Sequence, residues 1–361
     1  MKVAKFGGSS VAGAEQFKKV KAIVEADPER RVVVVSAAGK RNADDHKLTD
    51  LLYLCHAHLN YGVSCSDIFS TIEQRLTEIR DELGLSYDVE AELKELERTL
   101  SKDTPVDLLV SRGEYFTSKL MAEYLGYNFV DAADCVIFSF DGSIDYERSY
   151  ALIAEAAEKY GRIVIPGFYG RVSTGKIKVM TRGGSDITGS LAAVAVNADV
   201  YENWTDVSGI LMADPRIVDN PEPIKKITYA ELRELAFMGA TVLHEESVQP
   251  VREKSIPLNI RNTNRPQDPG TMIVGNIDRE NSDDRFITGI AGRKNFTIIT
   301  LQKHDMHTSH MLRQALEVFE RYHAPIEHIA LGLDSFALVT SSAGLGESIY
   351  QLMGDLQKAC H

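Results

Sequence analysis

The first 36 residues contain a strand, a helix and a second strand, in the order that a parallel sheet requires. Residues 31–36 contain four consecutive valines, and residues 2–6 carry Val3 and Phe6; β-branched and aromatic side chains favour strands, so we expect a strand at each place. Between them, residues 14–26 carry apolar side chains at steps of three and four from Phe17 to Val24, which predicts a helix with one buried face. Since parallel strands need a crossover connection, this unit predicts an α/β fold with helices covering a mainly parallel sheet.

The same pattern returns further along the chain. We expect additional strands at 108–110, 127–130, 162–165 and 199–204, with helices between them. Residues 66–102 differ, because they are dense in Glu, Arg, Lys and Leu and show no strand signal. We interpret them as a helical insertion of one or two helices beside the sheet, with most charges on a solvated face.

A polar, turn-rich stretch at 264–286 is the best candidate for a domain boundary. We therefore predict a catalytic domain over 1–275, a linker over 276–290 and a second domain over 291–361. The second domain reads as strands at 297–301, 326–331 and 336–340 and helices at 311–322 and 345–359. This βαββα order is one strand short of a ferredoxin-like unit, so an unpaired sheet edge favours a homodimer or higher homo-oligomer.

The charge balance restricts the class of partner. The 361 residues carry 40 basic and 52 acidic side chains, a formal net charge of −12. Nucleic acids and acidic membranes are therefore not expected partners, since binding them needs clustered Lys and Arg. No apolar run approaches the roughly 20 residues that span a bilayer. The strand pattern starts at once, so we expect no secretory signal, and four cysteines without a CxxC pair favour free thiols and a cytoplasmic enzyme.

Two diglycine loops are the main candidates for chemistry. Lys5-Phe6-Gly7-Gly8-Ser9-Ser10 lies where a strand ends and a helix is about to start, so free backbone N–H groups could hold a phosphate that the lysine also reaches. A plain strand-to-helix turn is the commoner explanation of an isolated Gly-Gly. Walker and protein-kinase signatures are missing from the sequence, so ATP would bind outside those superfamilies.

The second loop is Thr181-Arg182-Gly183-Gly184-Ser185-Asp186, followed by a helix of small residues. Arg182 offers a planar fork suited to a carboxylate, whereas Asp186 could be merely a helix cap. The density of Arg, Gly, Ser and Asp exceeds what a turn needs and favours ligand binding. A third candidate, from Trp204 to Arg216, follows a strand end, where open α/β sheets bind ligands.

Taken together, these segments resemble the amino-acid kinase superfamily and specifically its aspartate kinases. The resemblance covers residues 1 to about 275. Nine motifs carry it in the family's order: Lys5–Val11, Val35–Gly39, Thr49–Leu52, Ser111–Glu114, Pro166–Gly170, Arg182–Asp186, Trp204–Gly209, Asp214–Arg216 and Gly239–His244. It implies a three-layer αβα amino-acid kinase fold, followed by a partial α+β, ferredoxin-like ACT region that binds an end-product amino acid.

The resemblance also implies roles for individual residues. Lys5 and Asp186 would be catalytic, with Mg²⁺ carried mainly by ATP and no protein-held metal site. The nucleotide would contact Lys5, Gly7, Gly8, Ser9, Ser36, Thr205, Asp206, Asp214 and Arg216. L-Aspartate would contact Thr49, Glu114, Phe168, Arg182, Gly183 and Ser185, with Arg182 on a carboxylate and Glu114 on the α-ammonium.

The implied reaction is ATP-dependent phosphorylation of the aspartate side chain to 4-phospho-L-aspartate, the first step towards lysine, threonine and methionine. A carboxylate is already an anion at neutral pH, so positioning and charge neutralisation carry the catalysis and no general base is required. Two alternatives stay open. One is another kinase of the superfamily, such as a glutamate 5-kinase or acetylglutamate kinase; the other is a non-catalytic amino-acid sensor.

Some positions depart from the family pattern. Thr241 and Leu211 stand where lysine and tyrosine are common near the nucleotide, and Glu245 follows His244 in place of proline. The family's regulatory region normally has two ACT modules, so this chain is either naturally short or cut, and we expect lysine or threonine to inhibit it weakly or not at all. His304, His307 and His310 lie three apart, but their position before a helix favours ordinary polar residues over a metal site.

Overall fold

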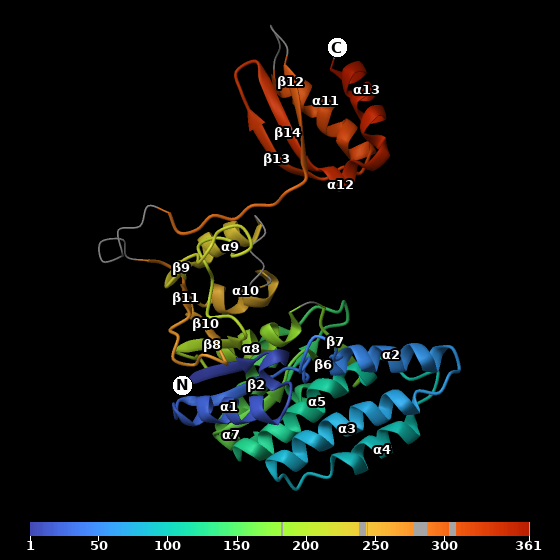
Figure 1. Cartoon of the computed structure of the whole chain (residues 1–361), viewed down its shortest axis with the longest axis vertical. Helices are drawn as coiled ribbons and strands as arrows, with labels where there is room; N and C mark the ends of the chain where they lie inside the picture. The colour runs from blue at the N-terminus through green and yellow to red at the C-terminus, as the bar shows by residue number, and fades with distance from the viewer. Residues whose placement is uncertain (182, 238–242, 244, 278–286, 303–307, 361) are drawn as a thin grey trace. The chain divides into compact units, whose positions relative to one another are not determined.

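A computed structural model of the chain describes all residues except 182, 238–242, 244, 278–286, 303–307 and 361, and it leaves the side chains of residues 245, 246, 308, 309 and 347 undescribed. The described residues form two compact units, Met1–Ala291 and Gly292–His361 (Figure 1). None of the helices that the structure describes is long and apolar enough to cross a membrane.

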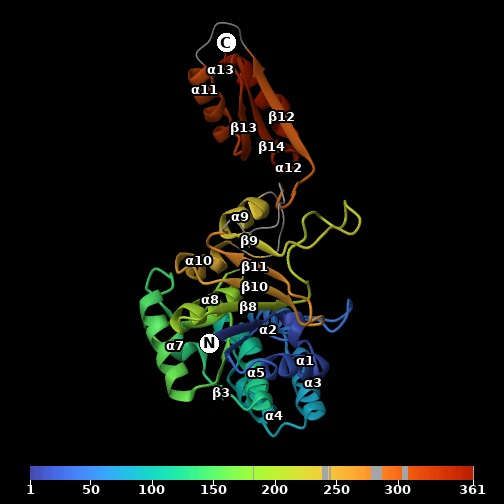
Figure 2. The same cartoon turned by 90° about the vertical axis from the view of Figure 1, so that its left-hand side faces the viewer.

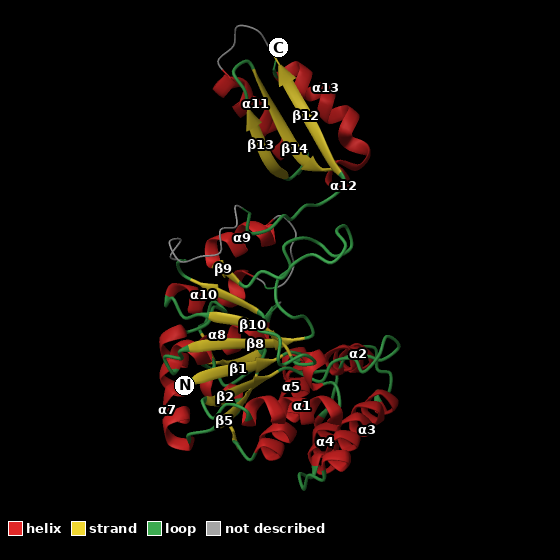
Figure 3. Ribbon diagram, turned by 60° about the vertical axis from the view of Figure 1, so that its left-hand side comes forward, coloured by secondary structure: helices red, strands yellow, loops and turns green. Residues whose placement is uncertain are grey.

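The first unit is built on an eight-stranded sheet with the order β3-β5-β2-β1-β8-β10-β11-β9 (Figure 3). Neighbouring strands are parallel except for the antiparallel pair β10 and β11. The strands are β1 (Lys2–Phe6), β2 (Arg30–Val35), β3 (Asn128–Phe129), β5 (Ile163–Pro166), β8 (Val200–Thr205), β9 (Lys226–Thr228), β10 (Leu258–Asn262) and β11 (Thr271–Val274). A small sheet joins β4 (Ile137–Phe138), β6 (Tyr169–Val172) and β7 (Ile177–Val179).

Helices cover both faces of the large sheet, as Figure 2 shows from the side. The helices of this unit are η1 (Gly8–Val11), α1 (Ala14–Glu25), α2 (Leu48–Asn60), α3 (Ser66–Leu83), α4 (Val89–Thr99), α5 (Val106–Leu125), α6 (Ala132–Cys135), α7 (Tyr146–Tyr160), α8 (Gly184–Ala195), α9 (Tyr229–Phe237) and α10 (Glu245–Glu253). The predicted α/β class with a mainly parallel central sheet is therefore confirmed.

Alternation along the central strands explains the three layers. In β2, Val32 and Val34 belong to one core, together with residues of α7, α8 and α10. Val33 and Val35 belong to the other core, with residues of α1, α2, α3 and α5. Successive side chains of a strand point to opposite faces, so an unbroken apolar run is what a strand buried on both faces requires.

One predicted strand is wrong. Residues 108–110 lie inside the long helix α5, which continues to Leu125. A short apolar run cannot by itself distinguish a strand from a buried helix. The buried positions of α5 continue to Phe116, Leu120 and Met121 at helical spacing, and this longer pattern identifies the segment as a helix.

The predicted helical insertion at 66–102 forms two helices, α3 and α4. Both pack apolar residues such as Phe69, Leu76 and Leu93 into the core on their side of the sheet. The insertion is thus part of the main unit and more than a solvated appendage.

The stretch 264–286, taken from the sequence as a boundary, contains the strand β11, which pairs with β10 and β9. Contacts divide the chain between Ala291 and Gly292, next to residue 291 where the sequence analysis starts the second domain.

The second unit has the βαββα order that the sequence predicts. Its elements are β12 (Phe296–Gln302), α11 (Thr308–Arg321), β13 (Ile326–Leu331), β14 (Ser335–Ser341), the short helices α12 (Ser342–Leu345) and η3 (Gly346–Ser348), and α13 (Ile349–Ala359). The sheet is antiparallel with the order β12-β14-β13. Its own core includes Ile299, Phe319, Phe336 and Leu352, so this unit buries apolar surface independently.

Candidate active site

A pocket of about 330 Å³ lies where β1 and β2 end and α8 begins. This is the carboxyl end of the parallel strands, where α/β sheets place their ligands. Eight residues predicted from the sequence line it: Lys5, Ser36, Thr49, Glu114, Phe168, Gly183, Ser185 and Asp186. Residues from six separate segments of the chain therefore converge on one site.

Lys5 forms a buried ion pair in this pocket. Its Nζ lies 2.6 Å from Oδ1 of Asp186, and the Lys5 residue is only 7% exposed. Nδ2 of Asn203 donates a hydrogen bond to the same carboxylate oxygen at 2.9 Å, and Nζ of Lys5 lies 3.5 Å from Oδ1 of Asn203. Burial makes this pair less screened by solvent than a surface salt bridge, so the lysine ammonium is held in one place.

Strand alternation explains why these groups meet. Val3 and Lys5 share one face of β1, and Tyr201 and Asn203 share the same face of β8, because Lys5 pairs in register with Asn203. Val3 and Tyr201 pack in the core that α8 also enters. The first turn of α8 carries Asp186 to the strand ends on that face.

Glu114 is a buried carboxyl group on α5. It is 4% exposed, and its Oε2 atom has no hydrogen-bond partner. Burial raises the pKa of Glu114 to about 8, opposed by a hydrogen bond from the backbone N–H of Ala37. An unpartnered buried oxygen that lines a pocket is suited to a cationic ligand group.

The first glycine loop forms backbone hydrogen bonds with two neighbouring segments, the end of β8 and the segment that follows β2. The Gly7 N–H donates to the Trp204 carbonyl at 3.0 Å, and the Gly39 N–H donates to the Gly8 carbonyl at 2.9 Å. A Cβ added at Gly39 would lie 2.6 Å from the Gly8 carbonyl carbon, so only glycine allows this approach. Gly7, Gly8 and Ser9 do not line the 330 Å³ pocket, although a Cβ at Gly7 would lie 3.6 Å from the Lys5 Nζ.

The second glycine loop packs closely against Phe168. Gly183 has φ 73° and precedes α8, and a Cβ added at Gly184 would lie 2.7 Å from Cδ2 of Phe168. Phe168 itself has φ 76°, and its N–H donates to Oγ1 of Thr188 at 3.2 Å. A left-handed conformation is costly for an aromatic residue, and the contacts with α8 maintain it beside the pocket.

The remaining nucleotide candidates lie outside this pocket. Thr205 ends β8 and its Oγ1 donates to the Asp206 carboxylate at 3.2 Å. Arg216 is bound to Asp214 through its Nε at 3.0 Å and Nη2 at 2.6 Å, and these bonds lower the pKa of Asp214 to about 2. The Arg216 side chain is 87% exposed, so the pair stands in solvent.

Several sequence predictions fall on residues that the structure does not describe. Arg182, Thr241 and His244 are among them, as are His304 and His307. Leu211 is described: it is 38% exposed and forms an isolated bridge with Pro223. Within the described ranges, no group of three or more His, Cys, Asp or Glu could hold a metal ion.

Sequence reasoning missed other residues of the site. Tyr53 lines the pocket, and Asn203 holds Asp186. Thr181 and Gly184, which also line the pocket, belong to the second glycine loop that the sequence predicts as ligand-binding. The available signal was a polar residue, Asn203, within the strand that the sequence predicts at 199–204. In the structure Asn203 is buried and lies in register with Lys5. Tyr53 gave no signal of its own, because its place follows from how α2 packs.

Comparison with known proteins places this geometry in a family. The model of the amino acid kinase family matches residues 1–262. Aspartokinase 3 of Bacillus subtilis is 35% identical over 354 residues, which cover 94% of this chain and 77% of that protein. The chloroplastic aspartokinase 1 of Arabidopsis thaliana is 30% identical over 95% of this chain, which spans 64% of that relative's length.

Solved structures agree with these relatives. The crystal structure of Clostridium acetobutylicum aspartate kinase superposes with a TM-score of 0.90 at 45% identity, covering 100% of this chain and 82% of that one. Escherichia coli aspartokinase III in complex with aspartate and ADP gives a TM-score of 0.72 at 26% identity, covering 100% of this chain and 84% of that one. The chain belongs to the amino acid kinase family and, within it, to the aspartokinases.

Proposed function

We propose that this protein transfers the γ-phosphoryl group of ATP to the side-chain carboxylate of L-aspartate, giving 4-phospho-L-aspartate and ADP, the first step of lysine, threonine and methionine biosynthesis. The observation that carries the proposal is one pocket holding both the Lys5–Asp186 pair and the unpartnered Glu114 carboxyl. The ammonium of Lys5 suits a phosphoryl group that is being transferred, and the carboxyl of Glu114 suits the amino group of the substrate. The relatives' names, which include aspartokinase and aspartate kinase, support this substrate.

Aspartate would be held at its two ends. Its α-ammonium would lie against Glu114, whose orphaned Oε2 would then gain a partner. Arg182 and Ser185 would bind the α-carboxylate, with Thr49, Phe168 and Gly183 forming the walls. The side-chain carboxylate would face Lys5, beside Ser36 at the junction with the γ-phosphate.

The reaction itself needs no base. An oxygen of the substrate carboxylate forms a bond to the γ-phosphorus, and the bond from that phosphorus to the β,γ-bridging oxygen breaks, leaving its electron pair on ADP. The obstacle is repulsion between two anions, so a fixed cation such as Lys5 stabilises the charge as it redistributes. Asp186 and Asn203 keep that ammonium in place and spare the cost of reorganising it during transfer.

The nucleotide would approach from the strand ends beside the first glycine loop. Gly7, Gly8 and Ser9 would offer backbone N–H groups to its phosphates. Thr205, Asp206, Asp214 and Arg216 would also hold the nucleotide, with Arg216 on its phosphates. Mg²⁺ prefers one or two carboxylates together with substrate phosphates, and Asp186 is a carboxylate of the pocket that fits this pattern. When bound with ATP, Mg²⁺ supplies positive charge to the phosphate groups.

Acyl phosphate trapping tests the proposal. The purified protein is incubated with ATP, Mg²⁺, hydroxylamine and one amino acid, and the hydroxamate and ADP are measured. We expect both products with aspartate and neither with glutamate or N-acetylglutamate. Turnover with glutamate would instead identify a glutamate 5-kinase, and amino-acid binding without turnover would identify a sensor.

For the second unit we propose an ACT-type amino-acid effector site. Support comes from the structure of Escherichia coli aspartokinase III in complex with lysine and aspartate, which matches this chain with a TM-score of 0.74 at 26% identity. Weak or absent inhibition by lysine or threonine, and a homo-oligomeric state, stay predictions that effector titration and light scattering test. A cytoplasmic location is also proposed, because Cys55, Cys65 and Cys135 form no disulfide in the part of the chain that the structure describes.

A further inference from the structure

An arginine of the helical insertion reaches the segment that leads into the pocket. Arg75, on α3, is 3% exposed. Its Nη2 donates to the Gly39 carbonyl at 2.6 Å, and its Nη1 donates to the His46 carbonyl. The same guanidinium lies 3.5 Å from the Asp45 carboxylate.

These contacts close residues 38–48 into a loop. The Leu48 N–H donates to the Ala38 carbonyl at 3.2 Å, so the two ends of the loop meet. The guanidinium of Arg75 bonds one carbonyl near each end, at Gly39 and His46. One planar side chain therefore fixes the width of the loop.

The residues that flank this loop belong to the proposed aspartate site. Ser36 precedes it and Thr49 follows it, and both line the 330 Å³ pocket. The loop also touches the phosphate side, since the Gly39 N–H donates to Gly8. Movement of the loop would thus displace both pocket walls and the glycine loop together.

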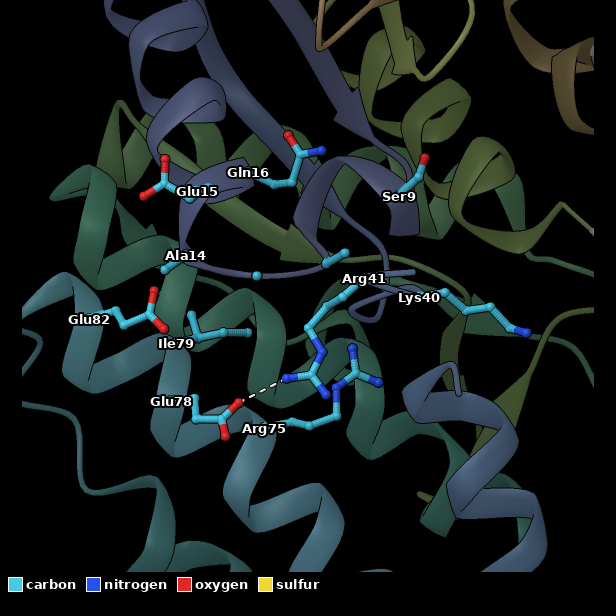
Figure 4. Close-up of a pocket in the computed structure, with 12 residues that line it drawn as sticks. Ser9, Ala14, Glu15, Gln16, Lys40, Arg41, Arg75, Glu78, Ile79 and Glu82 are labelled. Atoms are coloured by element: carbon cyan, nitrogen blue, oxygen red, sulfur yellow. Dashed lines mark hydrogen bonds and ion pairs between the residues drawn. The ribbon is translucent and has the colours of Figure 1, made fainter. Parts of the chain in front are cut away.

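The charges around Arg75 form a compact network. Figure 4 shows the guanidinium groups of Arg75 and Arg41 side by side, with Arg41 bonded to Glu78 at 2.8 Å. Asp45 accepts from the backbone N–H and Nε of Arg41, both at 2.9 Å. Although burial opposes it, these bonds and the charge of Arg75 hold the pKa of Asp45 well below its usual range.

A buried arginine is an expensive way to fill space. Burial lowers the pKa of Arg75, and its Nε atom has no partner. A well-packed apolar side chain would often stabilise the fold as well or better. What an arginine offers over an apolar side chain here is its bonding geometry, because a guanidinium can bond two carbonyl groups and a carboxylate in one plane.

We propose that Arg75 is a positioning residue for the substrate pocket, acting through the 38–48 loop on Ser36 and Thr49. This inference rests on the proposed aspartate kinase function and adds a role for the helical insertion to it. Arg75 does not line the pocket that takes aspartate; its side chain lines a separate cavity of about 300 Å³ beside α1 and α3.

The test compares Arg75→Met and Arg75→Lys with Arg80→Met in the full chain. Arg80 is a matched control, because it lies on the same helix and pairs only with α3 and α4 side chains among the contacts described, Asp81 at 2.7 Å and Glu90 at 3.5 Å. Two quantities are measured: KM for aspartate against kcat, and hydrogen exchange of peptides covering residues 37–48 without substrate.

We expect Arg75→Met to raise KM for aspartate at least tenfold and to speed exchange in 37–48 at least tenfold, with other peptides unchanged. For Arg75→Lys we expect values of KM and exchange between those of the wild type and Arg75→Met, because an ammonium cannot bond both carbonyls in the same plane. If Arg75→Met does not fold, Arg75→Lys is the variant that tests the proposal. Arg80→Met should change neither quantity more than twofold.

Folded Arg75 variants with wild-type KM and wild-type exchange would overturn the inference. So would faster exchange spread evenly over the first unit, because that pattern indicates a structural role only. If the wild-type protein makes no aspartyl phosphate, the proposed function fails, but local exchange in 37–48 still decides the role of Arg75.

Discussion

Oδ1 of Asp186 forms an ion pair with the ammonium of Lys5, at 2.6 Å, and accepts a hydrogen bond from the side-chain amide of Asn203, at 2.9 Å. Lys5 and Asn203 lie in register on neighbouring strands, and Asp186 stands in the first turn of α8. One carboxylate oxygen thereby fixes a cation at the end of the sheet. A fixed cation is what the transfer of phosphate to an anionic acceptor requires.

Replacing Lys5 with alanine should remove that cation from the transition state. We expect kcat to fall by about 10²–10³-fold, while KM for aspartate changes only a few-fold, because the α-ammonium and α-carboxylate keep their proposed partners. Steady-state kinetics with purified protein measures both. Lys18→Ala is the control, since Lys18 is exposed and pairs with Glu15 on α1. An unchanged kcat in Lys5→Ala would remove Lys5 from the mechanism.

Asn203→Ala should weaken the support of Asp186 without removing any charge. We expect a fall of about tenfold in kcat, smaller than for Lys5→Ala, because the ammonium would still pair with a less firmly held carboxylate. Asn128→Ala, an exposed position on the edge strand β3, should leave kcat unchanged. A wild-type kcat in Asn203→Ala would show that the ion pair needs no such support.

The raised pKa of Glu114 predicts pH-dependent aspartate binding. With a pKa of about 8, the free carboxyl is largely protonated at pH 6.5 and cannot pair with an ammonium group. KM for aspartate should therefore fall as the pH rises from about 6.5 to 8.5, as the carboxylate fraction grows. Glu114→Gln should show a higher KM that hardly varies over this range. A wild-type KM that is flat with pH would contradict the assignment.

The same shift predicts a stability cost. Since the folded pKa of about 8 exceeds the usual 4.5, the cost is absent below pH 4.5, grows between the two values and is complete above pH 8. Glu114→Gln avoids the cost and should gain free energy of unfolding relative to wild type, on the order of 2–4 kcal/mol more at pH 8 than at pH 5. Urea denaturation at the two pH values measures this difference. A difference between variant and wild type that does not change with pH would show that Glu114 is not desolvated.

Gly39→Ala should disturb the phosphate loop by steric contact. Its Cβ would lie 2.6 Å from the Gly8 carbonyl carbon, so the loop must shift, and we expect a raised KM for ATP and a kcat lower by about tenfold or more. Gly13→Ala is the matched control, because an added Cβ meets nothing within 4 Å there. Equal behaviour of the two variants would mean that the Gly8–Gly39 contact has no role in catalysis.

The sequence predicted the central strands well because they are buried on both faces. The run at 31–36 contains four consecutive valines, and the run at 2–6 carries Val3, Ala4 and Phe6; the structure has β2 and β1 there. The strand predicted at 108–110 was wrong because three consecutive apolar residues fit a helix as well as a strand. Only the longer helical spacing of α5 resolves such a run.

The residues of the site also differ in whether the sequence alone could predict them. Lys5, Asp186 and Glu114 were found because they stand in motifs that resemble aspartate kinases, and the structure brings them into one pocket. Asn203 and Arg75 were not found. Arg75 acts on backbone carbonyls of a distant loop, and such contacts depend on how α3 packs and leave no pattern in the sequence.

The central claim is that the pocket formed by Lys5, Asp186 and Glu114 is the aspartate site. A crystal structure of this protein with aspartate and ADP tests it most directly. We predict the aspartate α-ammonium on Glu114 and the side-chain carboxylate beside Lys5, with the ADP phosphates at Gly7 and Gly8. Aspartate bound elsewhere, with this pocket empty while ADP is present, would contradict the account.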